Sequence, residues 1–185
     1  MGSSSLHLDD PESFTLDDRG RSPAYFSKKA VMKVDAHLIS ELKEASSKFD
    51  GSNVRICLHD SPDADFHEMI NLEHKGKYYR PHKHPTKGES YHIIEGSTAF
   101  FVFDESGDVT DTNILDSNKS FIYRVSLDMY HALVPLSDIL IYHESKLGPF
   151  IRGLDSIFPV WAPDGEDLQE VQAYTKELLA NIQGR

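Results

Sequence analysis

Two histidines and a glutamate occupy one short stretch of the chain, with a glycine on either side. Five residues separate Gly76 from His82, four separate His84 from Glu89, and six separate Glu89 from Gly96. Side chains two residues apart leave the same face of a strand, so we expect the two imidazoles to point together. Two imidazoles and a carboxylate can hold a divalent metal at about 2.0–2.2 Å. This spacing predicts a metal site, and the alternative is a polar hairpin that faces solvent.

The same spacing resembles the first conserved motif of the cupin superfamily, which is complete here in residue types and intervals. Four phrases also resemble the cupin-fold metalloproteins of the WbuC type: RICLH (55–59), HEMINL (67–72), YYRPHKHPTKGES (78–90) and KLGPF (146–150). The resemblance covers residues 35–163. It implies a cupin barrel that binds a metal, in a group of proteins often encoded beside surface-polysaccharide genes.

The second cupin motif is eroded in this sequence. It usually has a proline, a glycine two residues later, a histidine after two more residues, and then an asparagine. The corresponding stretch, Ser126 to Pro135, keeps only His131, which follows the strand-like run FIYRVSL. The resemblance therefore implies His131 as the fourth metal ligand, beside His82, His84 and Glu89. The missing proline and glycine leave the geometry of the turn open.

Composition limits the class of protein. At 185 residues the chain is long enough for one domain with a substantial core. Its 30 acidic and 19 basic residues give a formal charge of −11, which argues against a nucleic-acid partner. The single cysteine, Cys57, excludes an internal disulfide, and its alternating context indicates a small buried strand residue rather than a reactive thiol. With no apolar run of membrane-spanning length and no secretion signal, we expect a cytoplasmic protein without membrane contact.

The pattern along the chain predicts a mainly β fold, a single cupin (double-stranded β-helix or jelly-roll) barrel with an N-terminal and a C-terminal helix. Asp35 can cap a helix over 36–48, in which Leu38, Leu42 and Ala45 form one apolar face. Short strand-like runs follow: VRICL, EMINLE, YYRPHKH, SYHIIE, GSTAFFVFD, NILD, SFIYRVSL, HALVPL and ILIYHES. Many short strands with close turn signals are typical of a sandwich or barrel.

These elements divide the chain into three parts. Residues 1–30 are polar and interrupted by prolines, and we interpret them as a loose arm or one that wraps a partner, outside the core. Residues 31–163 form the barrel with its leading helix. Residues 164–185 form a C-terminal helix whose apolar face includes Leu168, Val171, Leu178 and Ile182, with Trp161 holding the crossing against the core.

Strand alternation also predicts the lining of the site. If the strand around His82 is regular, Tyr78 and Arg80 point to the same side, and Tyr91 shares a face with Glu89. We interpret Tyr78, Tyr91 and Arg80 as candidate catalytic residues, able to contact an oxyanion or sugar hydroxyls. Arg80 could equally orient a ligand or extend into solvent. His92 should point away from the site.

Further polar residues along the chain could reach or support this site. Arg55 and His59 alternate together on another strand, and either could reach the same cavity. Tyr142 and Glu144 share a strand face that could support the metal ligands. His67 begins a stretch like the HExxH motif of zinc proteases, but Asn71 stands where the second histidine belongs. We therefore reject a protease.

Three histidines and one glutamate suit one divalent transition metal, Fe, Mn, Zn, Ni or Co. The favoured function is a metal-dependent enzyme acting on a small polar molecule such as a sugar or sugar derivative, by isomerisation or epimerisation, in surface-polysaccharide metabolism. The alternatives are a metal-dependent dioxygenase, a non-catalytic module that binds a small ligand, and a metal that only staples the barrel. The expected partners are a small molecule, carbohydrate in type, and a second copy of the chain in a homodimer.

Overall fold

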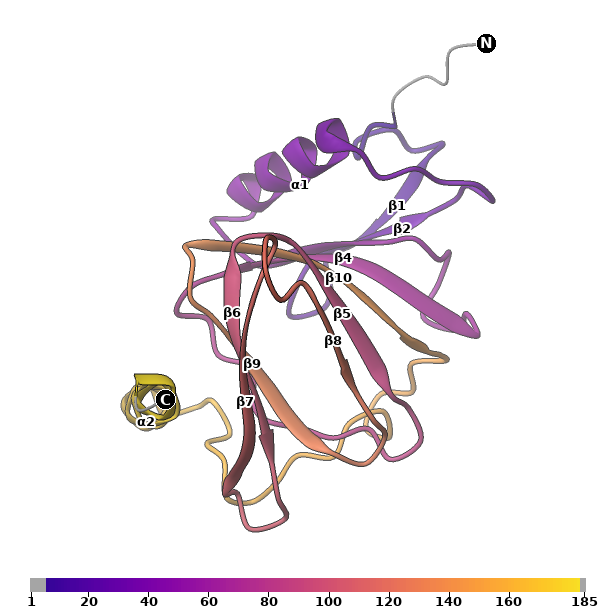
Figure 1. Ribbon diagram of the computed structural model, residues 1–185. Helices are drawn as coiled ribbons and strands as arrows, with labels where there is room; N and C mark the ends of the chain where they lie inside the picture. Colours follow the sequence, from indigo (N-terminus) through magenta and orange to yellow (C-terminus); the bar gives the residue numbers. More distant parts are fainter. Residues whose placement is uncertain (1–5, 184–185) are drawn as a thin grey trace.

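The computed structural model describes residues 6–183, which form two β-sheets and two α-helices (Figure 1). The larger sheet has seven strands in the order β1-β2-β3-β4-β10-β5-β8, and the smaller has three in the order β7-β6-β9. The elements in chain order are β1 (Phe14–Asp17), β2 (Ala24–Ser27), α1 (Ala36–Lys48), β3 (Val54–Cys57), β4 (Phe66–His74), β5 (Glu89–Glu95), β6 (Ser97–Phe103), β7 (Val109–Asp116), β8 (Ile122–Val125), β9 (Tyr130–Pro135), β10 (Ile139–Leu147) and α2 (Leu168–Gln183).

The interior between the two sheets is packed at one end by apolar side chains. Tyr91 and Ile93 of β5 meet Phe100 and Val102 of β6, and Leu140 of β10 joins the same cluster. Each of these residues is at most 5% exposed, as strand alternation towards a common interior requires. Polar side chains line the remaining part of the interior.

Helix α1 covers the outer face of the larger sheet, as Figure 1 shows. Its bounds match the sequence prediction, and the Asp35 side chain caps its N-terminus by accepting a hydrogen bond from the Leu38 N–H at 3.2 Å. Leu38 and Leu42 are buried against Val54 and Ile56 of β3. Because β3 gives these two side chains to the helix, its alternate residue Arg55 faces the interior of the barrel.

Helix α2 lies on the outer side of the smaller sheet (Figure 1). Leu178 is buried against Phe101 and Phe103, and Trp161 packs against the same cluster. The predicted apolar face holds for Val171, Leu178 and Ile182, but Leu168 is 71% exposed because it begins the helix, beyond its contact with the sheet. Within residues 6–183, neither helix combines the length and the apolar character needed to cross a membrane.

The start of the chain differs from the loose, non-core arm expected for residues 1–30. Residues 1–5 lie outside the described part, but β1 and β2 pair with each other, and β2 joins β3 in parallel with Ala24 opposite Arg55. Phe14 and Tyr25 are buried in the core beneath α1. The short runs FTL and AYF carry enough apolar area to join a sheet, although the average composition around them is polar.

The turn between β5 and β6 falls at Gly96, where the sequence predicted a division. Gly96 has a φ of 82°, and a Cβ placed there would lie 2.3 Å from the Ile139 carbonyl oxygen. Only glycine fits this conformation beside the neighbouring chain. The turn directs Glu89, at the other end of β5, into the open part of the interior.

The stretch YYRPHKH was expected to be a strand and is not a regular one. It contributes two isolated bridges, His82 with His131 and Lys83 with Ile157. Pro81 and Pro85 lack the N–H groups that a continuous ladder needs. The alternation therefore holds over residues 82–84 but not back to residue 78.

Candidate metal centre

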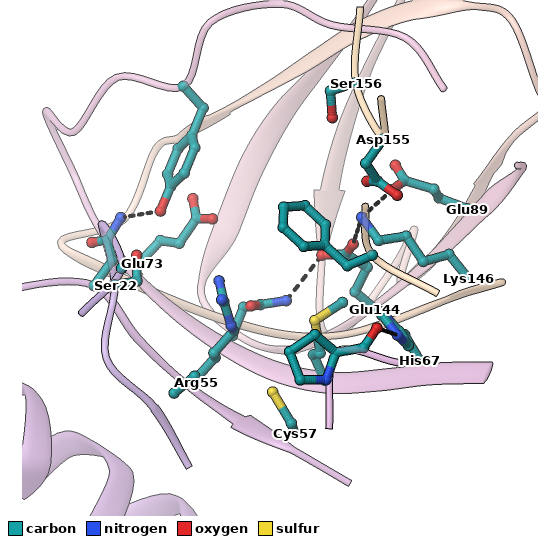
Figure 2. Close-up of a pocket in the computed structure, with 18 of the residues that line it drawn as sticks. Ser22, Arg55, Cys57, His67, Glu73, Glu89, Glu144, Lys146, Asp155 and Ser156 are labelled. Atoms are coloured by element: carbon teal, nitrogen blue, oxygen red, sulfur yellow. Dashed lines mark hydrogen bonds and ion pairs between the residues drawn. The ribbon is translucent and has the colours of Figure 1, made fainter. Parts of the chain in front are cut away.

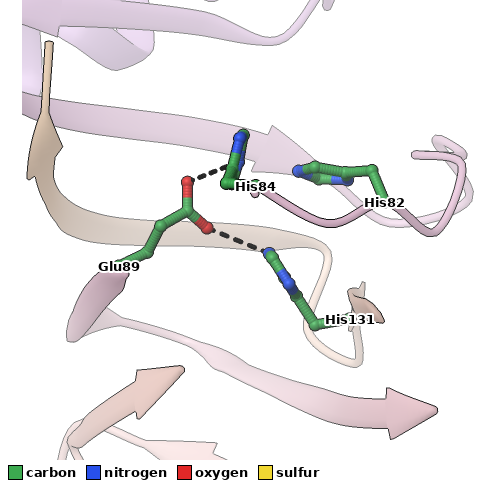
Figure 3. A group of neighbouring side chains, drawn as sticks. All are labelled: His82, His84, Glu89 and His131. Carbon is green, nitrogen blue, oxygen red and sulfur yellow. Dashed lines mark hydrogen bonds and ion pairs between the residues drawn. The ribbon is translucent and has the colours of Figure 1, made fainter. Parts of the chain in front are cut away.

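Four side chains predicted as metal ligands converge in the interior. One ligand atom from each of His82, His84, Glu89 and His131 lies within 4.8 Å of the others (Figure 3). His84, Glu89 and His131 are each 2% exposed. The structure thus brings together residues up to 49 positions apart in a group that could hold a metal ion.

The backbone clamps these ligands to one another. The His82 N–H donates to the His131 carbonyl at 3.1 Å, and the His131 N–H donates to the His82 carbonyl at 2.9 Å. The Asp128 N–H donates to the His84 carbonyl at 2.8 Å. This pairing fixes the residues 82–84 against the start of β9, despite the eroded second motif.

Each of the three histidines has its Nδ1 atom within hydrogen-bond distance of a backbone carbonyl. The carbonyls belong to Arg80 for His82 (3.2 Å), Asp155 for His84 (2.5 Å) and Met129 for His131 (2.9 Å). A carbonyl oxygen only accepts, so each Nδ1 donates to it, and a ring that is neutral then presents the lone pair of Nε2. A metal that binds through Nε2 requires this tautomer, in which the proton is on Nδ1.

The Glu89 carboxylate lies between two of these lone pairs. His84 Nε2 is 2.8 Å from Glu89 Oε1, and His131 Nε2 is 2.9 Å from Oε2. The His84 Nε2 atom is buried and makes no hydrogen bond, although it is close to the carboxylate. Two acceptors at such a distance repel unless a proton or a metal cation lies between them. The residues therefore fit a divalent cation, which would compete with protons for the same positions.

Burial and neighbouring charges set the protonation of the cluster. Burial lowers the pKa of His82 to about 3, so this imidazole is neutral at pH 7. Burial also lowers the pKa of His84, but the adjacent Glu89 carboxylate outweighs this effect and raises that pKa overall. Burial opposes a charged Glu89, yet Lys146 and the two histidines hold its pKa well below the usual value. Glu89 is therefore a carboxylate.

Tyr91 and Lys146 hold the two oxygens of Glu89. The Tyr91 hydroxyl donates to Oε2 at 2.5 Å, and Lys146 Nζ lies 2.8 Å from Oε1. Burial and the Glu89 charge raise the pKa of Tyr91 well above 10, so it remains a phenol. Lys146 also pairs with Glu144 at 3.0 Å. These contacts orient the carboxylate before any metal binds.

The cluster opens on a cavity of about 760 Å³ (Figure 2). In that view, Glu89, Lys146 and Asp155 lie on one side of the cavity, and Ser22 and Glu73 lie on the other. Arg55, His59, Tyr142 and Glu144, which alternation placed near the site, all line it. A cavity of this size holds a small molecule rather than a polymer.

The three candidate catalytic residues occupy different places. Tyr91 lies in the cluster, with its hydroxyl 3.4 Å from His131 Nε2. Arg80 lines the cavity, but one of its terminal nitrogens donates to the Pro159 carbonyl, and its guanidinium lies 5.7 Å from the centre of the Phe158 ring. That position matches the alternative of a fixed, supporting side chain as well as a binding role.

The placement predicted for Tyr78 is wrong. Its hydroxyl donates to the Pro163 carbonyl at 2.9 Å, its ring meets Tyr174 of α2, and it does not line the cavity. Tyr79 lines the cavity instead, with its hydroxyl accepting from Asn53 Nδ2 at 2.8 Å. The prediction required a regular strand, and the prolines break that regularity. His92 points away from Glu89 and is exposed, as alternation predicted.

Lys146, Asp155 and Glu73 were not identified from the sequence. Lys146 lies opposite Glu89 in the register of β10 and β5, a pairing that no local spacing reveals. Glu73 is 5% exposed, and burial raises its pKa to about 7. An acidic residue within the apolar strand run EMINLE was the one available signal for it.

Comparisons with known proteins agree with this architecture. A family described as Domain of unknown function (DUF6016) matches residues 34–115. No match was found among curated proteins. Among solved structures, the capsular polysaccharide assembling protein CapF from Staphylococcus aureus is similar, with 18% identity and a TM-score of 0.50 over 72% of this chain and 32% of CapF.

Two further solved structures are oxalate enzymes. Oxalate decarboxylase from Lactobacillus farciminis has 18% identity and a TM-score of 0.42, over 51% of this chain and 26% of that chain. Oxalate oxidase has 10% identity and a TM-score of 0.42, over 51% and 46%. This chain spans less than half the length of each structure. The similarity to CapF supports a cupin-like fold, which confirms the predicted mainly β architecture with a helix near each end.

Proposed function

We propose that this protein is a metal-dependent enzyme that isomerises or epimerises a small polar molecule, such as a sugar or sugar derivative. One observation carries the proposal. Two imidazoles direct Nε2 towards the Glu89 carboxylate, and His82 joins them in a cluster whose ligand atoms lie within 4.8 Å, beside a cavity of about 760 Å³. Four protein ligands leave one or two positions of a five- or six-coordinate ion open to a substrate.

A divalent metal in this cluster would supply a Lewis acid that polarises a carbonyl or hydroxyl oxygen. The surrounding residues then have distinct tasks. Tyr91 keeps its proton and holds Glu89 in place, while Arg80 and Tyr79 offer donors to substrate oxygens from the cavity wall. Glu73, with a pKa raised by burial to about 7, is the lining residue best matched to exchange a proton near neutral pH.

The proposed setting is surface-polysaccharide metabolism. It rests on the resemblance of the phrases RICLH, HEMINL, YYRPHKHPTKGES and KLGPF to WbuC-type proteins. CapF, a capsular polysaccharide assembling protein, supports the fold alone at 18% identity. The homodimer and the cytoplasmic location stay predictions.

Elemental analysis tests the metal directly, on protein never exposed to a nickel column. We expect about one transition-metal ion per chain in the wild type and in His92→Ala, whose histidine is exposed on the opposite face of β5. His84→Ala should lose the metal because one of four ligands is gone. Equal metal content in His84→Ala and the wild type would disprove the site.

Activity assays on the metal-loaded protein separate an enzyme from a binding module. A panel of sugars and sugar derivatives, followed by NMR, should reveal conversion that is absent from His84→Ala at equal protein concentration. Stabilisation by a sugar without any conversion would indicate a binding module and not an enzyme. If the protein unfolded on metal removal and no sugar stabilised it or was converted, the metal would have only a structural role. Oxygen consumption would favour a dioxygenase.

A further inference from the structure

Arg55 places a guanidinium in the cavity without a carboxylate partner. Its Nε atom is buried and has no hydrogen-bond partner, and among residues 6–182 no carboxylate forms an ion pair with it. Figure 2 shows the side chain extending from β3 into the pocket. An arginine side chain stays charged at any physiological pH, and Arg55 is only partly buried, so its buried Nε is a donor that an incoming anion could satisfy.

The acidic side chains that line the same cavity are committed elsewhere. Asp17 pairs with Arg19 at 2.9 Å, and Glu144 pairs with Lys146 at 3.0 Å. Glu73 accepts a hydrogen bond from Tyr142 at 2.7 Å, and its raised pKa leaves it largely protonated below pH 7. Arg55 helps to lower the pKa of Asp17 at longer range, after Arg19, but among residues 6–182 none of these carboxylates forms an ion pair with Arg55.

A second arginine in the cavity has the same feature. The Nε atom of Arg80 is also buried without a partner, while one of its terminal nitrogens is held by the Pro159 carbonyl. Two positive groups with unused donors in one cavity create a local potential that favours an anion. Carboxylate and phosphate oxygens match the forked donors of arginine.

A row of polar contacts along the cavity wall connects Arg55 to the metal cluster. Arg55 lies opposite Asn71 in the pairing of β3 and β4, and Asn71 Nδ2 donates to Glu144 Oε2 at 3.0 Å. Glu144 contacts Lys146, which contacts Glu89 at 2.8 Å. Arg55 and the metal ligands thus line one cavity.

We propose that Arg55 binds the anionic group, a carboxylate or a phosphate, of the small molecule whose other end reaches the His82, His84, Glu89 and His131 cluster. The second half of this proposal rests on the proposed function, since it makes the same cavity the substrate site. The substrate is accordingly an acidic small molecule, such as a sugar acid or sugar phosphate in chemical class.

Thermal unfolding with simple anions tests the proposal. Sodium phosphate and sodium acetate serve as probes at pH 7, with sodium chloride at equal ionic strength as the comparison. We expect phosphate or acetate to raise the Tm of the wild type by about 3–5 °C when the probe exceeds its Kd about tenfold. The anion that acts distinguishes a phosphate from a carboxylate substrate.

Two variants make the result specific. Arg55→Gln should weaken the probe's affinity by about tenfold or more, because a charge-assisted contact is lost. Arg124→Gln removes an exposed arginine of β8, outside the cavity, and should keep the full shift. Without a probe, Arg55→Gln should unfold at or above the wild-type Tm because an unpaired charge has been removed.

Three results would overturn the proposal: no shift with either anion, an unchanged shift in Arg55→Gln, or a lower Tm of Arg55→Gln without a probe, which would make Arg55 structural. Metal content is measured on the same samples. Anion binding at Arg55 without a bound metal would leave this proposal standing and refute the proposed function. Metal binding without anion binding would refute the role of Arg55 and leave the proposed function standing.

Discussion

The two ends of the cavity differ in how completely their polar atoms are satisfied. At the metal end, each histidine Nδ1 contacts a carbonyl and both oxygens of Glu89 have neighbours, while His84 Nε2, which makes no hydrogen bond, lies 2.8 Å from Glu89 Oε1. At the other end, Arg55 Nε and Glu73 Oε2 are buried without partners. The first end is organised in advance around one small cation. The second lacks partners that an incoming polar molecule could supply.

The two ends also come from different kinds of contact. The metal end is assembled from a short stretch, residues 82–89, together with one residue of β9. The Arg55 end depends on the pairing of β2 with β3 and of β3 with β4, which brings the start of the chain to the cavity. The comparison teaches that a local motif defines the metal ligands, whereas long-range strand pairing defines what else can bind.

Glu89→Ala gives the largest expected effect, because it removes a ligand and a buried counter-charge together. We expect metal content to fall to near zero and the free energy of unfolding to fall by about 3–5 kcal/mol, since Lys146 and His84 lose a buried partner. Elemental analysis and urea unfolding measure the two losses.

Glu95→Ala is the matched control for this change. Glu95 ends the same strand, and its side chain is 46% exposed in an ion pair with Lys43. Its removal should cost less than about 1 kcal/mol and leave the metal in place. If the two variants lost the same amount of metal and of unfolding free energy, the metal end would not be specially preorganised compared with the rest of the molecule.

Glu73→Gln tests the other end through pH. Burial raises the pKa of Glu73 from 4.5 to about 7, so the folded protein holds this proton more tightly than the unfolded chain does. Wild-type stability is therefore lost as pH rises from about 4.5 through 7, by roughly 3 kcal/mol in total. Glutamine keeps an acceptor for Tyr142 but cannot ionise.

The variant should be more stable than the wild type at pH 8, and the advantage should shrink by about 2–3 kcal/mol at pH 5. Urea unfolding at both pH values measures it. An advantage that did not change with pH would show that Glu73 is already ionised in the folded protein, and that this end of the cavity is more polar than its burial indicates.

Asp35→Ala gives the smallest expected effect and tests whether the two ends can be perturbed separately. Asp35 caps α1, which packs behind Arg55's strand β3. Loss of the cap should lower the free energy of unfolding by about 1 kcal/mol, whereas Asp35→Asn should retain most of it. Metal content should be unchanged in both variants. Loss of metal from Asp35→Ala would couple α1 to the distant metal end.

Local patterns predicted the elements whose physics is local. The Asp35 cap and the apolar face of Leu38 and Leu42 predicted α1 with its observed bounds. Gly96 predicted the division of β5 from β6 because its positive φ excludes other side chains. The stretch around Tyr78 failed, since prolines break the alternation on which the prediction rested. The strands β1 and β2 were missed because each short run gains its stability from pairing with a neighbouring strand, β1 with β2 and β2 with β3, and not from its own composition.

The sequence by itself predicted three of the four candidate ligands from their spacing, and the resemblance to the cupin motifs implied the fourth, His131. His82, His84 and Glu89 lie within eight residues of one another. A local turn is enough to bring their side chains together, so their types and spacing already indicate a metal site. Only the tertiary structure decided that Lys146 neutralises Glu89 and that Arg55 and Glu73 share the ligands' cavity. The reason is that these contacts join strands distant in sequence, whose register depends on the packing of the whole sheet.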